Sequence, residues 1–184
     1  MSRSDATLRN RLQLLREHFR EGRYGQAENM LLHLIRARLT REARLECAHL
    51  ARRAGFTVLA LRFLHPQVFG RLAARNPATS DEKAEYAASL SILGSAGEAR
   101  RLFLEVDVAK APEAGYLRAV SVMAEWDFAP AVPDLEAYLK SKPSKSQQVA
   151  AELRLATCYL REPSRPDDTD RAKKILDDVI RRTD

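Results

Sequence analysis

The chain has 184 residues, of which 45% are hydrophobic, so it can bury one sizeable core. Only 7 Gly and 8 Pro accompany abundant Ala, Leu, Arg and Glu, a composition that favours helices and argues against a β-rich fold. No segment approaches the roughly 20 apolar residues that span a bilayer, and residues 1–13 lack the apolar centre of a secretory signal. We therefore expect a soluble, cytoplasmic protein with no membrane contact.

The net charge of +6 is unevenly distributed along the chain. Residues 1–76 carry 15 Arg, no Lys and 6 acids, whereas residues 77–184 carry 16 bases and 19 acids. Such a split indicates an anionic partner for the first part, such as an acidic protein segment or a nucleic acid. The simpler explanation is a general use of Arg in place of Lys on solvated faces, since the chain has 24 Arg and 7 Lys.

Apolar residues recur with helical spacing in ten segments, which form five pairs separated by short turns. In chain order the predicted pairs are 5–20 with 25–38, 41–53 with 57–64, 80–93 with 96–107, 112–125 with 130–141, and 145–161 with 169–182. Pro66 is expected to end or kink the fourth helix, and residues 66–75 can form a short additional helix.

Helix boundaries are marked by their usual residues. Ser95 with Glu98 and Ser144 with Gln147 have the capping-box spacing, and Ser80 precedes two acids. The turns contain glycines after helices and prolines at helix starts, namely Gly22, Gly55, Gly94, Pro112 and Pro130.

A small residue lies early in the second helix of every pair. These residues are Ala27, Ala60, Ala99, Ala131 and Ala172, at spacings of 33, 39, 32 and 41. Four positions further on, the residue is apolar each time: Leu31, Leu64, Phe103, Leu135 and Leu176. A small side chain allows the paired helices to approach closely, so this face is predicted to be buried.

This pattern resembles the tetratricopeptide repeat family over most of the chain. The fifth pair fits the family's order of residues, with Leu155, Ala156, Tyr159, Ala172 and Leu176. The Trp expected early in the first helix of each repeat is absent, since the one Trp, Trp126, lies at a helix end. The resemblance implies a single all-α domain over residues 1–184, a right-handed superhelix of about five antiparallel helical hairpins, whose first helices line a concave groove that binds a peptide or partner helix.

Arginines follow the polar face of the first and third predicted helices. We expect this surface to bind a partner through Arg9, Gln13, Arg16, Arg20, Arg41, Arg44 and Arg52. Because guanidinium groups bind carboxylates in a bidentate manner, an acidic segment or a C-terminal carboxylate is the predicted ligand. The alternative is a nucleic-acid or phosphate-binding helical protein that uses the same arginines, which ranks lower because no aromatic side chain is expected beside them.

No phosphate loop, nucleophile motif or paired-Cys zinc pattern occurs, so we expect a protein-interaction adaptor that is not an enzyme and has no cofactor. His18, His33, His49 and His65 recur every 15 or 16 residues, but they fall late in successive antiparallel helices and are not expected to converge on a metal. Cys47 and Cys158 are predicted to be reduced core thiols.

The last predicted helix still has an apolar stripe of Ile175, Leu176, Val179 and Ile180 where the sequence stops. The end of a helical stack needs a polar cover. We therefore expect either self-association through the C-terminal hairpin or a longer protein of which these residues are the N-terminal domain.

Overall fold

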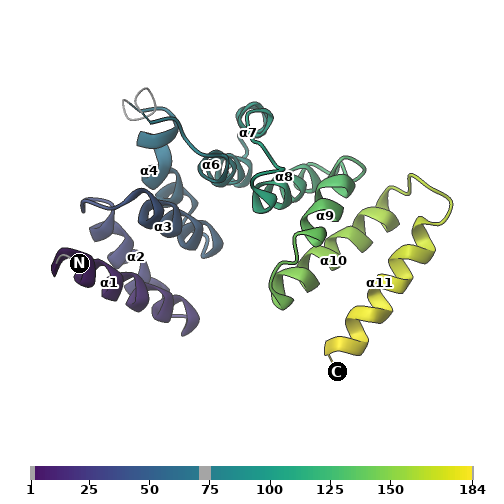
Figure 1. Ribbon diagram of the computed structural model, residues 1–184, viewed down its shortest axis with the longest axis horizontal. Helices are drawn as coiled ribbons and strands as arrows, with labels where there is room; N and C mark the ends of the chain where they lie inside the picture. Colours follow the sequence, from purple (N-terminus) through teal and green to yellow (C-terminus); the bar gives the residue numbers. More distant parts are fainter. Residues whose placement is uncertain (1–2, 71–75, 184) are drawn as a thin grey trace. The chain divides into compact units, whose positions relative to one another are not determined.

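The computed structural model describes residues 3–70 and 76–183, and this part of the chain forms ten helices and no strand (Figure 1). The helices are α1 (Arg3–Arg20), α2 (Tyr24–Leu34), α3 (Arg41–Arg53), α4 (Thr57–Val68), α6 (Ser80–Ile92), α7 (Ala96–Leu104), α8 (Pro112–Ala124), α9 (Ala131–Lys140), α10 (Lys145–Arg161) and α11 (Asp168–Thr183). The predicted all-helical class is confirmed for these residues. The chain divides into two compact units, Met1–Leu102 (unit 1) and Phe103–Asp184 (unit 2).

Unit 1 is built around α3, which packs on α1, α2, α4 and α6. In sequence order α1 pairs with α2 and α3 with α4, as antiparallel neighbours joined by short turns do. The interior is apolar: Leu15, Leu31, Phe63 and Leu64 are fully buried. Helix α6 closes this core by packing on both α3 and α4.

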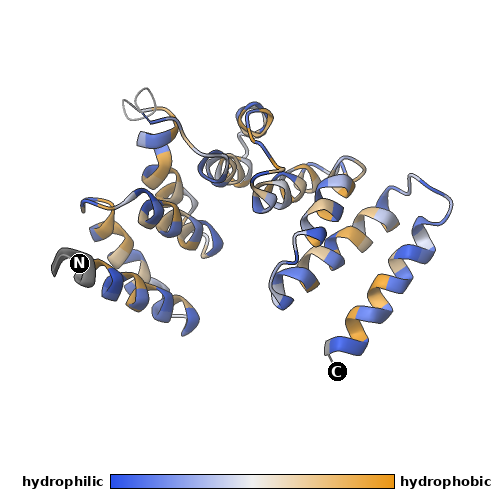
Figure 2. Ribbon diagram, in the orientation of Figure 1, coloured by the Kyte–Doolittle hydropathy of each residue, from blue (hydrophilic) through white to orange (hydrophobic). Residues whose placement is uncertain are grey.

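Unit 2 has one continuous apolar core that joins α8, α9, α10 and α11. Its buried members are Ala119, Ala131, Leu135, Tyr138, Ala151, Leu155, Ala156, Cys158, Tyr159 and Ala172. Apolar and polar residues alternate in bands along α11 (Figure 2). Ile175 and Leu176 pack against the core and Val179 is buried, whereas Ile180 is 56% exposed. Most of the stripe that was expected to need an external cover therefore packs inside its own unit.

The five small residues that anchor the predicted pairs are all buried. Ala27, Ala60, Ala131 and Ala172 are 0% exposed and Ala99 is 1% exposed. Of the apolar residues one turn further on, Leu31, Leu64, Phe103 and Leu135 are buried and Leu176 is half-buried. A side chain no larger than a methyl group lets neighbouring backbones approach, which explains the recurrence of alanine.

Four turns have the same hydrogen-bond pattern. After α3, Gly55 N–H donates to the Arg52 carbonyl at 3.0 Å and Phe56 N–H donates to the Ala51 carbonyl at 2.8 Å. This is the Schellman arrangement, in which the residue after the helix takes a left-handed conformation that glycine adopts without strain. Gly22, Gly55 and Gly94 hold this position with φ of 70°, 86° and 83°, as the sequence predicts. After α8 the position is held by Trp126, with φ of 64°.

Several helix boundaries differ from the prediction. Helix α6 is capped by Thr79 instead of Ser80, because Thr79 and Glu82 form the capping box. Helix α4 does not end before Pro66 but continues to Val68, since a proline in the last turn of a helix removes only one hydrogen bond. Residues 71–75 lie outside the described part, and with them most of the additional helix proposed for 66–75. Helices α2 and α7 are shorter than predicted and end at Leu34 and Leu104.

Candidate partner-binding surface of unit 1

Two of the arginines predicted to bind a partner are held by buried carboxylates of α6. Arg41 on α3 donates to Glu82 from Nε at 2.7 Å and from Nη2 at 2.5 Å, and it also donates to the side chain of Asn76 and the carbonyl of Pro77 at 2.6 Å each. The Glu82 side chain is 1% exposed. A buried carboxylate requires a partner, so Arg41 fixes α6 against α3.

Arg52 makes the second bridge between the same helices. Its Nε donates to Glu85 Oε1 at 2.5 Å, while His49 Nδ1 lies 3.2 Å from Glu85 Oε2. Burial raises the pKa of the Glu85 carboxyl, but the hydrogen bonds from His49 and Arg52 outweigh burial and hold this pKa below its usual value. Glu85 is therefore charged at neutral pH, and Arg52 neutralises it.

The other predicted partner residues lie on the surface of α1 and α3. Arg9 and Arg20 are exposed and Arg44 is half-buried. Arg16 donates to Glu46 across the α1–α3 contact at 2.7 Å, and Gln13 donates to Glu17 at 3.0 Å. The seven residues are thus divided between those with a side-chain partner inside unit 1 and those on its open surface.

A hollow of about 490 Å3 lies between the end of α2, α4 and α6, and we call it the α4 hollow. Its lining residues are Ile35, Arg36, Val58, Leu61, Arg62, His65, Pro66 and Tyr86. Val58 is an apolar residue that is 59% exposed. Arg36 and Arg62 are exposed, and neither makes an ion pair within the described residues. The hollow therefore combines apolar walls with guanidinium groups that have no acidic partner there.

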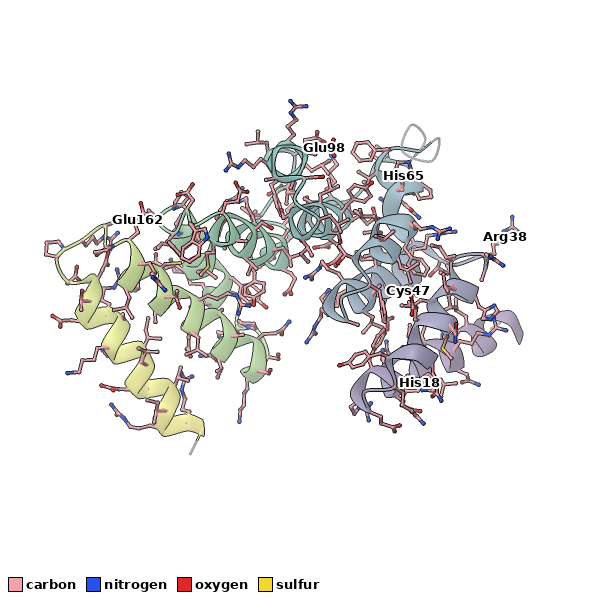
Figure 3. The ribbon with its side chains drawn as sticks, turned by 180° about the vertical axis from the view of Figure 1, so that it is seen from behind. His18, Arg38, Cys47, His65, Glu98 and Glu162 are labelled. Atoms are coloured by element: carbon pink, nitrogen blue, oxygen red, sulfur yellow. The ribbon has the colours of Figure 1, made fainter. Side chains whose placement is uncertain are left out.

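Two of the residues that line this hollow, His65 and Tyr86, contact each other across α4 and α6. The Nδ1 of His65 lies 3.2 Å from the hydroxyl of Tyr86, and Figure 3 shows the His65 side chain near the C-terminal end of α4. Phe69, which is 58% exposed, contacts both rings, tilted against His65 with centroids 5.9 Å apart and edge-on to Tyr86 with centroids 5.4 Å apart. The sequence pattern does not mark these three residues as a binding site. Exposed apolar residues on α4 were the available signal, but their convergence with Tyr86 depends on tertiary packing.

A second, smaller hollow of about 300 Å3 lies where α1 and α3 end, and we call it the α1 hollow. It is lined by Phe19, Arg20, Tyr24, Leu50, Arg53 and Ala54. Tyr24 is 52% exposed, and its ring centroid lies 6.4 Å from that of Phe19. The expectation that no aromatic side chain lies beside the predicted arginines is wrong here, because Phe19 and Tyr24 share this hollow with Arg20.

Groups suited to redox or metal chemistry are not brought together. Over the ranges described, no set of three or more His, Cys, Asp or Glu could hold a metal ion. The free thiols Cys47 and Cys158 are buried, as predicted, and burial raises their pKa to about 12 and about 11. A thiol with such a pKa is not a nucleophile at neutral pH. Within the same residues, every helix is too short or too polar to cross a lipid bilayer.

Comparisons with protein-family models, with curated proteins and with solved structures found no match. The described residues form an all-helical protein of packed neighbouring helices, with two hollows in unit 1 that contain both arginine and apolar or aromatic side chains.

Proposed function

We propose that this protein is a non-enzymatic, cytoplasmic interaction module whose five helical pairs form a right-handed, tetratricopeptide-like superhelix, and that it binds an acidic peptide or partner helix. The α4 hollow is the observation that carries this proposal. Its apolar walls suit one or two apolar side chains of a partner, and its unpaired arginines suit acidic residues beside them.

The chemistry of the hollow favours a carboxylate ligand over a neutral one. Arg36 and Arg62 are both exposed on its rim, and no acidic side chain is among the lining residues. A guanidinium group binds a carboxylate through two parallel hydrogen bonds, which are stronger than those between neutral groups. An apolar residue flanked by Glu or Asp would therefore satisfy both the walls and the rim.

The arginines of α1 and α3 contribute to this proposal unequally. Arg9, Arg20 and Arg44 are available for a partner at the surface. Arg41 and Arg52 would have to abandon buried carboxylates to bind one, and this would leave Glu82 and Glu85 without their charge partners. We assign Arg41 and Arg52 a structural role in holding α3 to α6.

The α1 hollow favours a second candidate function, the binding of a single-stranded nucleic acid. Phe19 and Tyr24 offer ring faces on which a base can stack, and Arg20 and Arg53 offer charge for the adjacent phosphates. Nucleic acid ranks below a peptide because this hollow is smaller and contains only these two aromatic rings.

The test uses a fluorescently labelled helical peptide that presents two Leu residues one turn apart among Glu residues. Fluorescence anisotropy should give saturable binding, and Arg36→Glu with Arg62→Glu should weaken it about tenfold or more. The matched control is Arg9→Glu with Arg20→Glu, which changes the charge equally on another surface and should weaken binding less.

Each alternative has its own outcome. Loss of peptide binding only in the Arg9 and Arg20 variant would move the site to α1. Tight binding of a labelled single-stranded oligonucleotide, weakened by salt and by Arg53→Glu, with no peptide binding, would replace the proposal by the nucleic-acid function.

A further inference from the structure

Trp126 occupies a turn position that glycine holds in the three corresponding turns. Trp126 N–H donates to the Met123 carbonyl at 3.0 Å and Asp127 N–H donates to the Val122 carbonyl at 3.2 Å, which repeats the bonds seen at Gly55. Its φ of 64° is in the left-handed region, where the Cβ of an L residue crowds the following carbonyl oxygen. Glycine would fit this turn with less strain.

Burial does not explain the presence of tryptophan at this position. The Trp126 side chain is 73% exposed, so most of its apolar surface remains in contact with water. Two neighbours contact it. The ring of Phe128 meets it edge-on, with centroids 6.1 Å apart, and the guanidinium carbon of Arg161 lies 5.8 Å from its centroid. The indole thus has two neighbours while most of it stays accessible.

The surroundings of Trp126 are acidic in a chain that is basic overall. The α8–α9 turn and the α10–α11 loop are joined by Glu162, whose carboxylate accepts hydrogen bonds from Phe128 N–H and Ala129 N–H at 3.0 Å each. Figure 3 shows Glu162 at the end of α10. Together the two segments, 125–130 and 161–170, contain two basic and six acidic residues: Arg161, Arg165, Glu125, Asp127, Glu162, Asp167, Asp168 and Asp170.

These acidic residues differ in burial and in their hydrogen bonds within the chain. Asp168 is buried and accepts from Ser164 N–H, Arg165 N–H and Arg171, so it ties the α10–α11 loop to the first turn of α11. Asp127 and Asp170 are exposed. The Trp126 surface, defined as residues 125–130 and 161–170, therefore contains exposed carboxylates as well as an exposed aromatic ring.

We infer that the Trp126 surface docks a basic segment of a partner protein, with one Lys or Arg placed against the indole and others paired with the carboxylates. The electron-rich face of tryptophan is the strongest side-chain site for a cation, and Arg161 already uses it within the chain. The excess of negative charge selects for basic partners and against acidic ones. Tryptophan is also enriched among the residues that contribute most to binding at protein interfaces.

The experiment uses the intact chain, whose single tryptophan reports directly on this surface. An octapeptide of alternating Lys and Ala is titrated while Trp126 emission is recorded, with a Glu and Ala octapeptide and a Pro-rich octapeptide as comparisons. We expect a saturable change with the Lys peptide alone. Asp127→Asn should reduce its affinity, whereas Asp177→Asn, an exposed carboxylate elsewhere in unit 2, should not.

Trp126→Gly separates binding from folding. Binding of the Lys peptide to this variant, measured by calorimetry, should be lost although the net charge is unchanged. The same variant should melt about 2–4 °C higher than the original protein, because glycine relieves the left-handed strain.

Any of four results would overturn the inference. They are an unchanged Trp126 emission with the Lys peptide, equal binding by Trp126→Gly, saturation by the Pro-rich peptide instead, and an emission change that depends on protein concentration without peptide, which would indicate a second copy as the partner. A lower melting temperature for Trp126→Gly would refute the argument from strain.

Discussion

Unit 1 and unit 2 both join neighbouring helices through an arginine bound to a buried carboxylate, as Arg118 on α8 and Asp134 on α9 do in unit 2, but unit 2 also uses a second kind of contact. In unit 1, α3 and α6 are bridged by arginines bound to carboxylates that are 1% and 3% exposed. In unit 2, buried tyrosines donate to carboxylates of neighbouring helices, Tyr138 to Glu113 at 2.8 Å and Tyr159 to Glu136 at 2.7 Å. The tyrosine rings also belong to the apolar core.

A carboxylate can thus be bound inside the protein either by an arginine or by a tyrosine hydroxyl, and the two contacts differ in energy. An arginine bridge places two full charges in a low-dielectric interior, so removing one partner leaves the other uncompensated. A tyrosine contributes apolar area and needs only one hydrogen bond for its hydroxyl. Both units should therefore be sensitive to loss of a bridging charge, and unit 2 should in addition be sensitive to loss of the tyrosine protons.

The largest effect is expected for Glu85→Ala in unit 1. This substitution leaves the Arg52 guanidinium, whose side chain is only 14% exposed, without its carboxylate. It should lower the free energy of unfolding by about 3–5 kcal/mol, measured by urea denaturation followed by circular dichroism. Glu85→Leu combined with Arg52→Met should recover most of the loss, since it removes both charges and keeps the volume. A double variant as unstable as Glu85→Ala would show that the charges are not the cause.

Leu135→Ala should have the next largest effect, in unit 2. Leu135 is 0% exposed in the apolar core, so the substitution removes buried methyl groups and leaves a cavity. We expect a loss of about 3 kcal/mol in the free energy of unfolding, followed by Trp126 fluorescence because Trp126 lies in this unit. Leu153→Ala, at a position that is 41% exposed, is the matched control and should cost well under half as much.

Alkaline pH should weaken the hydrogen bonds from Tyr138 and Tyr159 and so lower the stability of the protein. Burial, followed by the hydrogen bonds to Glu113 and Glu136, raises the pKa of Tyr138 and Tyr159 above the ordinary value of 10.0. Because the folded pKa exceeds the unfolded one, the protonated tyrosines contribute fully below pH 10 and their contribution falls as pH rises above it.

The urea midpoint, followed by circular dichroism, should therefore begin to fall as the pH rises above about 10. The double variant Tyr138→Phe and Tyr159→Phe should show a smaller drop, since only Tyr86 of unit 1 then remains among the tyrosines whose pKa is clearly raised by burial. An identical drop in the double variant would assign the alkaline transition to other groups.

The smallest effects concern the helix caps, where the two units should behave alike. Each cap residue donates a backbone hydrogen bond to the side chain three positions further on. Thr79 N–H donates to Glu82 at 2.8 Å, and Ser144 N–H donates to Gln147 at 3.2 Å. Thr79→Ala and Ser144→Ala should each lower the free energy of unfolding by about 1 kcal/mol. Ser146→Ala, at the second residue of α10, should leave it nearly unchanged. If the two substitutions lowered the free energy of unfolding by clearly different amounts, the two capping boxes would not contribute equally to stability.

The helices and their buried faces could be predicted because their signals are local. Recurrent alanines, glycines after helices and the spacing of Ser144 and Gln147 involve residues only a few positions apart. The predicted bounds of α10, 145–161, agree with the structure at both ends. Pro66 misled the prediction because its effect depends on how close it lies to the helix end. Thr79 was missed because Ser80 is an equally good cap by composition.

The interaction surfaces depend on contacts that local patterns do not specify. Arg41 and Arg52 follow the polar face of α3 as any exposed arginine would, yet their carboxylates lie 41 and 33 positions further on. The α4 hollow forms only where α2, α4 and α6 pack together. In the sequence, Trp126 is only a departure from a repeat pattern, and nothing there shows that its indole is exposed. A sequence periodicity predicts which face of a helix is polar, but not which polar residue is already bound.

Each unit contains one buried cysteine, Cys47 in unit 1 and Cys158 in unit 2. A thiol-specific reagent can reach either one only when the surrounding helices open, so the labelling rate at each position measures the opening of its own unit under native conditions. Equal opening free energies at the two positions would show that the units unfold as one cooperative body. Unequal values would show that one can open while the other stays folded.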